Sequence, residues 1–301
     1  MQEEKPKVYF TKEISPEKLI EMYKKLDINL PGNLGIKVHS GEKGNKNFIR
    51  PEFFKPIVDY LDGTIIETNT SGGDNPIFAR SKTERHLKLL EEHGWTKTFK
   101  KVEILDSEPP DEEIEIENPL QIKKNIIGKN TKKYDSILVL SHFKGHGLGG
   151  YGGALKQLSI GFASAIGKTL IHSAGKNLDP NQLMTNFCED KIFKECMADA
   201  ASTIVKRYKG RMAFINCMVN ISIDCDCDGN AKPPCMKDIG ILSSIDPVAL
   251  DQACLDLIYG SDQEGKEQLI QRIESKIGLH IIDCAVKHGM GKKEYELINV
   301  D

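Results

Sequence analysis

The segment SHFKGHGLGGYGGALKQLSIG, residues 141–161, gathers side chains and backbone groups that could bind or transform a ligand. It lies between an apolar, β-branched run and a stretch with helical periodicity. A glycine-rich turn that enters a helix exposes backbone N–H groups beside the positive helix end, which suits a phosphate or a carboxylate. We therefore predict an anion site on a strand-to-helix turn, with Lys156 adding positive charge. Its ligand-binding residues are predicted to be Gly149, Gly150, Gly152 and Gly153. The alternative is that these glycines serve only tight turns and close helix packing.

The histidines of this segment are candidates for proton transfer or for metal binding. His142 and His146 are four residues apart, but the glycines around them indicate a loop, where that spacing defines no common face. His39 and Glu42 occupy a second polar loop, and we predict that all four act catalytically together with the lysine named above. His172, in KTLIHSAGK, is a further candidate of the same kind. The alternative is that these histidines are structural or solvated.

The polar stretch IDCDCDGNAKPPC, residues 223–235, offers thiols and carboxylates outside any apolar pattern. Thiolates two residues apart can bind one soft metal ion or two irons of a cluster. The metal ligands predicted from this stretch are Cys225, Cys227, Cys235 and Asp224. In the alternative interpretation, the acids accept backbone hydrogen bonds and the thiols are merely buried. No C-x-x-C-x-x-C run occurs, so a self-contained four-iron ferredoxin module is absent from the sequence.

The other five cysteines lie in apolar or helical patterns and are predicted to be small core residues. They are Cys188, Cys196, Cys217, Cys254 and Cys284. Spacing alone leaves open whether Cys188, Cys196 and Cys235 take part in a site. A disulfide framework is not expected, because we predict a reducing, cytoplasmic location.

Composition narrows the classes of function. The chain has 301 residues, 39% of them hydrophobic and 28% charged, with a formal net charge of −3. Lysines are scattered among acids, so we expect no nucleic-acid partner. The first residues lack the apolar core of a secretion signal, and no stretch approaches the roughly 18 apolar residues of a membrane span. We therefore expect no membrane association.

Strand and helix patterns alternate along the chain, which predicts an α/β fold with a mainly parallel sheet and helices on both faces. We expect a single domain over residues 1–301, or two lobes over 1–135 and 136–301. The predicted strands are 7–11, 33–40, 63–70, 134–140, 211–223 and 295–300, with short strands between 98 and 130. The predicted helices are 15–26, 51–61, 80–94, 154–166, 190–208, 246–259 and 265–278. Ser15 and Asp246 are predicted N-caps, each followed by a proline at the first helical position.

Ligands of such sheets collect at the carboxyl ends of the strands. The polar clusters of this sequence fall there, in the loops 39–45, 67–74, 141–153 and 224–230. Asn69 and Thr70, in the second of these loops, are predicted to bind the ligand. We expect the four loops to converge on one pocket.

Five segments in the same order resemble the family named domain of unknown function 362 (DUF362). They are IKVHSGEKGN, TIIETNT, SHFKGHGLGGYGGALKQLSIG, DCDC and DIGILSSIDPVALDQACLDLI. Members are often described as related to iron–sulfur proteins or ferredoxins, because many carry an inserted pair of cluster motifs before the DCDC loop. Here that interval keeps Cys188 and Cys196 without the cluster spacing.

A shorter stretch is similar in layout to the nickel-pincer lactate racemases. Those enzymes carry a histidine, a glycine-rich turn and a lysine, as GHGLGGYGGALKQLSIG does. The resemblance places Lys156 at the position of a cofactor-tethering lysine, and His142 and His146 at base or ligand positions. Ala154 and Leu155 interrupt the racemase-like pattern, so it implies a shared site at the sheet edge and not the activity.

Two functions follow from these observations. The first is a metal-dependent enzyme that acts on a small anionic molecule, with a metal ion or an iron–sulfur cluster as cofactor. The alternative is a non-catalytic metal or iron–sulfur carrier without a ferredoxin module, which serves a redox or metal-delivery partner.

Overall fold

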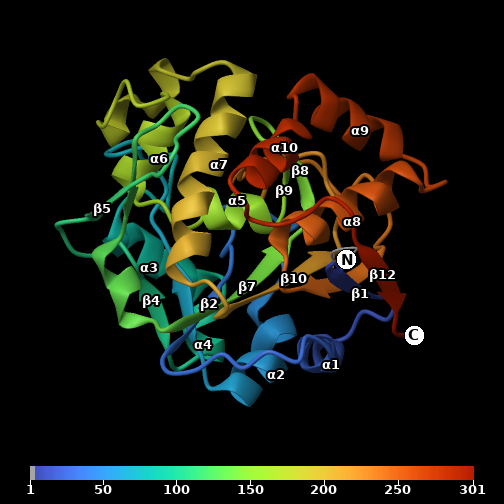
Figure 1. The fold of residues 1–301 in the computed structure, drawn as a ribbon. Coiled ribbons are helices and arrows are strands. Elements are labelled where there is room, and N and C mark those ends of the chain that lie inside the picture. Colours follow the sequence, from blue (N-terminus) through green and yellow to red (C-terminus); the bar gives the residue numbers. More distant parts are fainter. Residues whose placement is uncertain (1–3) are drawn as a thin grey trace.

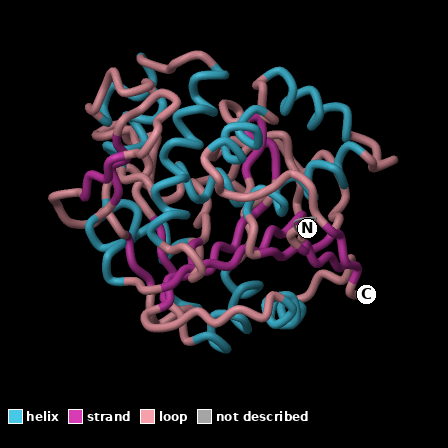
Figure 2. Tube along the Cα trace, viewed as in Figure 1, coloured by secondary structure: helices cyan, strands magenta, loops and turns pink. Residues whose placement is uncertain are grey.

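An eight-stranded sheet forms the centre of the molecule, and helices cover both of its faces (Figures 1 and 2). The computed structural model describes residues 4–301. The strands lie in the order β12-β1-β11-β10-β7-β2-β3-β4. Neighbouring strands are parallel except where β11 runs against β1 and β10. The predicted α/β class with a mainly parallel sheet is confirmed.

The eight strands come from both expected lobes, residues 1–135 and 136–301, and together they form one sheet. Its strands are β1 (Lys7–Thr11), β2 (Leu34–Lys37), β3 (Thr64–Glu67), β4 (Val102–Ile104), β7 (Ser136–His142), β10 (Met212–Met218), β11 (Gly240–Ser244) and β12 (Glu296–Asn299). Two separate hairpins are formed by β5 (Glu112–Glu115) with β6 (Lys124–Ile127), and by β8 (Lys144–His146) with β9 (Gly150–Gly152). The first hairpin confirms the short strands expected between residues 98 and 130.

Two apolar clusters attach the helices to the sheet, one on each face. On β7, Ile137 and Val139 belong to one cluster, and Leu138 and Leu140 belong to the other, as the period of two in a strand requires. One face is covered by α1 (Pro16–Lys25), α2 (Pro51–Leu61), α3 (Thr83–Glu92) and α4 (Trp95–Thr98). The other is covered by α5 (Ala154–Ser159), α6 (Ala165–His172), α7 (Asp190–Arg207), α8 (Pro247–Tyr259), α9 (Lys266–Ser275) and α10 (His280–Lys287). The 3₁₀ turns are η1 (Lys129–Lys133) and η2 (Pro180–Thr185).

The two predicted helix starts are confirmed by their caps. Ser15 accepts a hydrogen bond from the N–H of Lys18 at 3.3 Å. Asp246 accepts from the N–H groups of Val248 and Ala249, each at 2.9 Å. A proline occupies the first turn of both helices, where its missing N–H leaves no hydrogen bond unmade.

Three predicted elements differ from the structure. The helix expected over 154–166 is two helices, because the chain turns at Gly161, where a Cβ would lie 2.3 Å from the carbonyl oxygen of Gln157. The glycines after β7 form the β8–β9 hairpin rather than a simple strand-to-helix turn. The strand expected over 211–223 ends at Met218, and Asn220 then reverses the chain at a φ of 48°.

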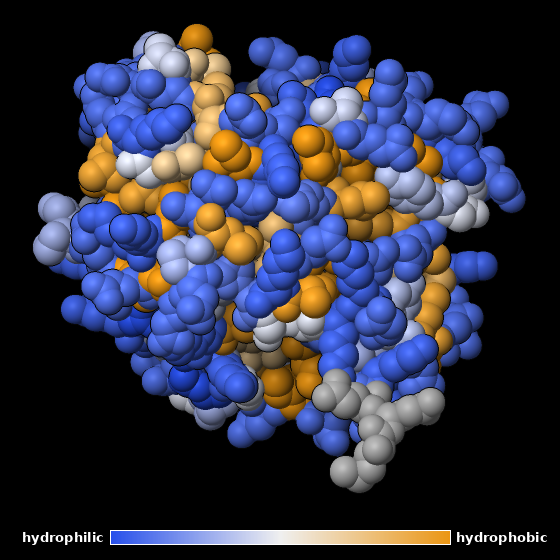
Figure 3. Space-filling view, turned by 45° about the horizontal axis from the view of Figure 1, so that its top comes forward, coloured by the Kyte–Doolittle hydropathy of each residue, from blue (hydrophilic) through white to orange (hydrophobic). Residues whose placement is uncertain are grey.

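Within residues 4–301, no helix combines the length and the apolar character needed to cross a membrane. On the face shown in Figure 3, hydrophilic side chains predominate and apolar side chains form small, separate patches.

Candidate functional site

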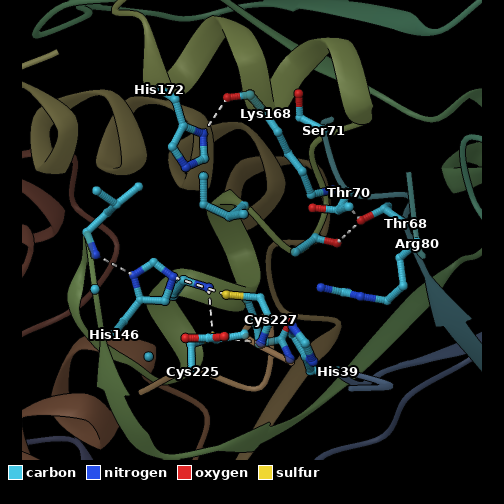
Figure 4. Close-up of a pocket in the computed structure, with 18 of the residues that line it drawn as sticks. His39, Thr68, Thr70, Ser71, Arg80, His146, Lys168, His172, Cys225 and Cys227 are labelled. Atoms are coloured by element: carbon cyan, nitrogen blue, oxygen red, sulfur yellow. Dashed lines mark hydrogen bonds between the residues drawn. The ribbon is translucent and has the colours of Figure 1, made fainter. Parts of the chain in front are cut away.

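A cavity of about 430 Å³ lies where the loops after β2, β3, β7 and β10 meet. Each of the four loops contributes to its lining, for example with His39, Thr70, His146 and Cys225 (Figure 4). The convergence follows from the sheet, since these four strands run in the same direction and end at the same edge.

Close backbone contacts fix the loop that carries Cys225. A Cβ at Gly145 would lie 2.2 Å from the carbonyl oxygen of Ile223, so the β8–β9 hairpin can approach this loop only with glycine at that position. From the other side, the side-chain amide of Asn45 donates to the carbonyl oxygen of Cys225 at 3.3 Å. The loop is therefore held between two neighbouring loops of the sheet edge.

Two thiols of this loop share a small polar cluster with a histidine and a lysine. Ligand atoms of Cys225, Cys227 and His146 all lie within 4.8 Å of one another. The Nζ of Lys156 is 3.9 Å from the sulfur of Cys225, and the N–H of Cys227 donates to the same sulfur at 3.4 Å. Burial opposes ionisation of Cys225, but the hydrogen bond from the Cys227 thiol and the charge of Lys156 lower the pKa of Cys225 well below its usual value. The same hydrogen bond raises the pKa of Cys227 well above its usual value, so Cys225 is the member of the pair that ionises first.

Hydrogen bonds fix the position of the proton on His146. Its Nδ1 accepts from the N–H groups of Leu148 at 3.1 Å and Gly149 at 2.7 Å. Burial and the charge of Lys156 lower the pKa of His146 to about 4, so the ring is neutral near pH 7. Its single proton is on Nε2, which lies 3.6 Å from the sulfur of Cys227. His146 thus offers a hydrogen to the thiols and not a lone pair.

His142, predicted to act catalytically, is buried beside Asp226 and does not line the cavity. Its Nδ1 faces both carboxylate oxygens of Asp226, at 2.9 and 3.0 Å, and its Nε2 faces the carbonyl oxygen of Val219 at 2.6 Å. Lys144 binds the same carboxylate at 2.8 Å. Both ring nitrogens of His142 are therefore occupied by contacts within the protein.

Glu42, also predicted to be catalytic, lies behind the cavity wall. It pairs with Arg80 at 3.4 Å and accepts the N–H of Ala79 at 3.0 Å. Arg80 lies 3.6 Å from Glu67, which pairs with Lys37 at 2.8 Å. These side chains form a buried ion-pair network that directs Arg80 and Lys37 into the cavity.

Two lysines of the cavity make no close ion pair with a carboxylate. Among residues 4–301, neither Lys156 nor Lys168 forms a salt bridge to an acidic side chain. The half-buried Lys156 lies against the sulfur of Cys225. The Nζ of Lys168 donates to Thr68 Oγ1 at 2.7 Å and to the carbonyl oxygens of Asn69 at 2.7 Å and Ala163 at 2.6 Å. Burial lowers the pKa of Lys168 to about 7, although the charge of Asp106 opposes this shift. Both lysines line the cavity and give it a basic character that suits an anion.

The N-terminus of α5, predicted to bind an anion, is occupied by a side chain of the protein itself. The carboxylate of Asp251 accepts the N–H groups of Ala154 at 2.8 Å and Leu155 at 3.0 Å. These two N–H groups are therefore not free for a ligand. Gly153 allows this approach, since a Cβ there would lie 2.4 Å from the carboxylate.

The structure brings some predicted site residues together and separates others. Those that line the cavity are His39, Thr70, His146, Gly152, Gly153, Lys156, His172, Asp224, Cys225 and Cys227. Those that do not line it are Glu42, Asn69, His142, Gly149, Gly150, Cys235, Cys188 and Cys196.

The excluded residues have other contacts. Asn69 bonds to Thr83 at 2.9 Å, and Gly150 packs against Gly278. Cys235 donates to the carbonyl oxygen of Ile221 at 3.4 Å and is outside the thiol cluster. Asp224 does line the cavity, but Arg272 binds its carboxylate at 3.1 Å.

Charged side chains that line the cavity and were not predicted include Arg80, Lys144 and Lys168. Lys168 had a detectable signal, because a lysine interrupts the otherwise apolar helix AIGKTLIH. The orientation of the Arg80 side chain depends on its ion pairs with Glu42 and Glu67, which are distant in sequence. No local sequence pattern indicates this orientation.

Comparison with functionally curated proteins gives no match. One similar solved structure is the lactate racemase apoprotein from Thermoanaerobacterium thermosaccharolyticum, at 13% identity and a TM-score of 0.41, over 70% of this chain and 50% of the racemase. Another is a structural-genomics protein from Thermotoga maritima, at 14% identity and a TM-score of 0.41, over 91% of this chain and 59% of that protein. The chain thus spans about half to three fifths of the length of these two proteins.

The family expected from the five sequence segments is confirmed. The model of the domain of unknown function DUF362 matches residues 34–256, which include all four loops of the cavity and the capping Asp251. The chain belongs to the DUF362 family.

Proposed function

We propose that the protein is a metal-dependent enzyme that acts on a small anionic molecule in this cavity. The observation that carries the proposal is the placement of two thiols, Cys225 and Cys227, beside Lys156 in a cavity that Lys168 and Arg80 also line. Thiolates favour soft metal ions such as zinc, copper(I) or iron. Lys156, Lys168 and Arg80 supply positive charge for an anion in the same cavity.

The residues fit a metal ion held by the two thiolates. The pKa of Cys225 already favours the form that binds metal. His146 fits less well as a third ligand, because histidine ligands usually donate a hydrogen bond from the second ring nitrogen, whereas Nδ1 of His146 accepts two. A metal ion with an open position supplies a Lewis acid. The chain's own residues bind the anion and place the Nε2–H of His146 beside it.

Metal content of anaerobically purified protein tests the metal site. We expect the double variant Cys225→Ser, Cys227→Ser to lose the bound metal, because serine hydroxyls do not replace thiolates. Cys235→Ser is the matched control and should retain it. His146→Ala should also retain it, since this ring offers a hydrogen rather than a lone pair. Metal that stays bound in the double variant contradicts the proposed ligands.

Thermal denaturation tests the anion site. Acetate, glycolate, benzoate and inorganic phosphate are the probes, and we expect at least one to raise the midpoint by about 5 °C at a hundredfold excess over its Kd. Lys156→Met should abolish this rise. Lys43→Met, which changes a side chain that is 69% exposed, should preserve it. Metal binding without any effect of the four anions contradicts the enzyme and supports a metal carrier that serves a redox or delivery partner. The cytoplasmic location remains a prediction.

A further inference from the structure

His172, at the end of α6, presents a nitrogen lone pair to the cavity. Its Nδ1 lies 2.6 Å from the carbonyl oxygen of Lys168, which can only accept, so Nδ1 carries a hydrogen. Burial lowers the pKa of His172 to about 3, so the neutral ring holds no second proton near pH 7. The ring is 9% exposed and lines the cavity. Within residues 4–301, its Nε2 has no hydrogen-bond partner.

The other two histidines that line the cavity have the opposite arrangement. Nδ1 of His39 accepts the N–H of Gly41 at 3.1 Å, and Nδ1 of His146 accepts two backbone N–H groups. Both rings therefore carry hydrogen on Nε2. Figure 4 shows His39 and His146 at the end of the cavity that holds the two thiols, whereas His172 and Lys168 lie at the opposite end. The cavity has hydrogen-bond donors at one end and an unused acceptor at the other.

We infer that His172 is the hydrogen-bond acceptor for the molecule bound in this cavity. The inference rests on the proposed function, because it takes the cavity to be the ligand site. A ligand that bonds to the donors at one end of the cavity and to the acceptor at the other is a small carboxylate or phosphate whose far end carries a hydroxyl or amino group. Its anionic oxygens lie near Lys156, His39 and His146, and its O–H or N–H group donates to Nε2 of His172.

The geometry keeps this lone pair available. The carbonyl oxygen of Lys168 fixes the hydrogen on Nδ1 of His172, so Nε2 stays free to accept. The Nζ of Lys168 already donates to three oxygens and does not compete for Nε2.

A metal ion is the competing partner for this lone pair. Histidine ligands commonly donate their second ring nitrogen to a backbone carbonyl, as His172 does. However, His172 belongs to neither potential three-ligand group found among residues 4–301. The acceptor role toward a ligand therefore fits the surroundings better.

Nitrogen NMR of histidine-labelled protein at pH 7 tests the tautomers directly. We expect a neutral ring protonated at Nδ1 whose signals vanish in the variant His172→Phe, and a neutral ring protonated at Nε2 whose signals vanish in His146→Phe. His172→Phe keeps a ring beside Phe187 and Phe193, which pack against His172. An imidazolium or an Nε2–H tautomer for His172 overturns the inference, whatever the cavity binds.

Ligand discrimination tests the role of the lone pair. The probes are 4-hydroxybenzoate and 4-methoxybenzoate, which differ in the hydrogen that His172 would accept. We expect 4-hydroxybenzoate to bind the wild type about three- to tenfold more tightly than 4-methoxybenzoate does. The two compounds should bind His172→Phe with equal affinity, and the metal content of this variant should be unchanged. Equal affinities in the wild type, or metal loss in His172→Phe, overturn the inference. If neither probe binds, the ligand class assigned here is wrong, whereas the anion site itself is judged by the four anions named above and the tautomer by the NMR result.

Discussion

Asp226 provides the negative charge beside two buried basic side chains. Its buried carboxylate lies against His142 and Lys144, and the backbone N–H of Glu42 donates to its carbonyl oxygen at 2.7 Å. Burial would raise the pKa of Asp226, but the charges of His142 and Lys144 lower it. The Asp226 carboxylate therefore joins the loop between β10 and β11 to β7 and β8, and its backbone carbonyl joins the same loop to the loop after β2.

We expect Asp226→Asn to lower the free energy of unfolding by about 3–5 kcal/mol, because it leaves two buried cations without a counter-charge. Urea denaturation at pH 7 measures the change. Asp228→Asn, two residues away in the same loop and exposed, is the matched control and should change the free energy by less than about 0.5 kcal/mol. Similar effects of the two substitutions contradict this assignment.

Single residues were predictable by type but not by partner. His146, Lys156, Cys225 and Cys227 were identified because reactive side chains in glycine-rich loops after strands commonly face a site. The sequence could not show that His142 binds Asp226, because the two residues are 84 positions apart. A residue's chemistry depends on such distant hydrogen bonds, which local patterns do not encode.

At the scale of elements, the short helix α5 depends on α8. Asp251, from α8, caps the first N–H groups of α5 and also accepts the side-chain amide of Asn216 at 2.7 Å. Its carboxylate occupies the volume that a side chain at position 153 would need. Gly153 is therefore required for contact between the two helices.

We expect Gly153→Ala to lower the free energy of unfolding by about 1–3 kcal/mol, since its Cβ would meet Asp251 at 2.4 Å and Phe143 at 2.9 Å. Gly147→Ala tests a glycine of the same run with no atom within 4 Å of the added Cβ, and it should change stability by less than about 0.5 kcal/mol. The urea denaturation midpoints of the two variants, compared with that of the wild type, test this prediction. A tolerated Gly153→Ala contradicts the contact described here.

The predicted elements were most accurate where end signals were strong. Ser15–Pro16 and Asp246–Pro247 correctly began two helices, because a cap and a following proline act within one turn. The division between α5 and α6 was missed. Residues 154–166 keep helical periodicity, and what interrupts the helix is the turn at Gly161, followed by a bridge between Ala163 and Ile127.

At the scale of the whole molecule, buried neutral histidines control the response to acid. Burial lowers the pKa values of His86 and His172 to about 3 and that of His146 to about 4, against about 6.5 when unfolded. Between these values the unfolded chain binds protons that the folded chain does not. Their contribution to stability is complete above about pH 6.5 and is lost progressively as the pH falls toward the folded-state pKa values.

We expect the free energy of unfolding to fall by about 4 kcal/mol per pH unit below pH 6, because His86, His146, His172 and the similarly shifted His39 each contribute about 1.4 kcal/mol, while Asp251, whose pKa burial raises to about 6, offsets about the same amount. Urea denaturation from pH 7.5 to 4.5 measures this slope. His172→Phe should reduce it by about one third. A free energy of unfolding that stays constant between pH 7 and pH 5 contradicts the prediction.

The connection between β10 and β11 has a further consequence. Since β11 runs against β10, residues 219–239 leave and re-enter the sheet at the same edge, without a crossover helix. The segment that carries Cys225 and Cys227 is therefore a loop whose two ends are fixed on adjacent strands. A sequence grafted between Met218 and Gly240 would have to keep Asp226, which pairs with His142 and Lys144, and the core residues Ile221 and Met236, in order to change the chemistry presented to the cavity without loss of stability.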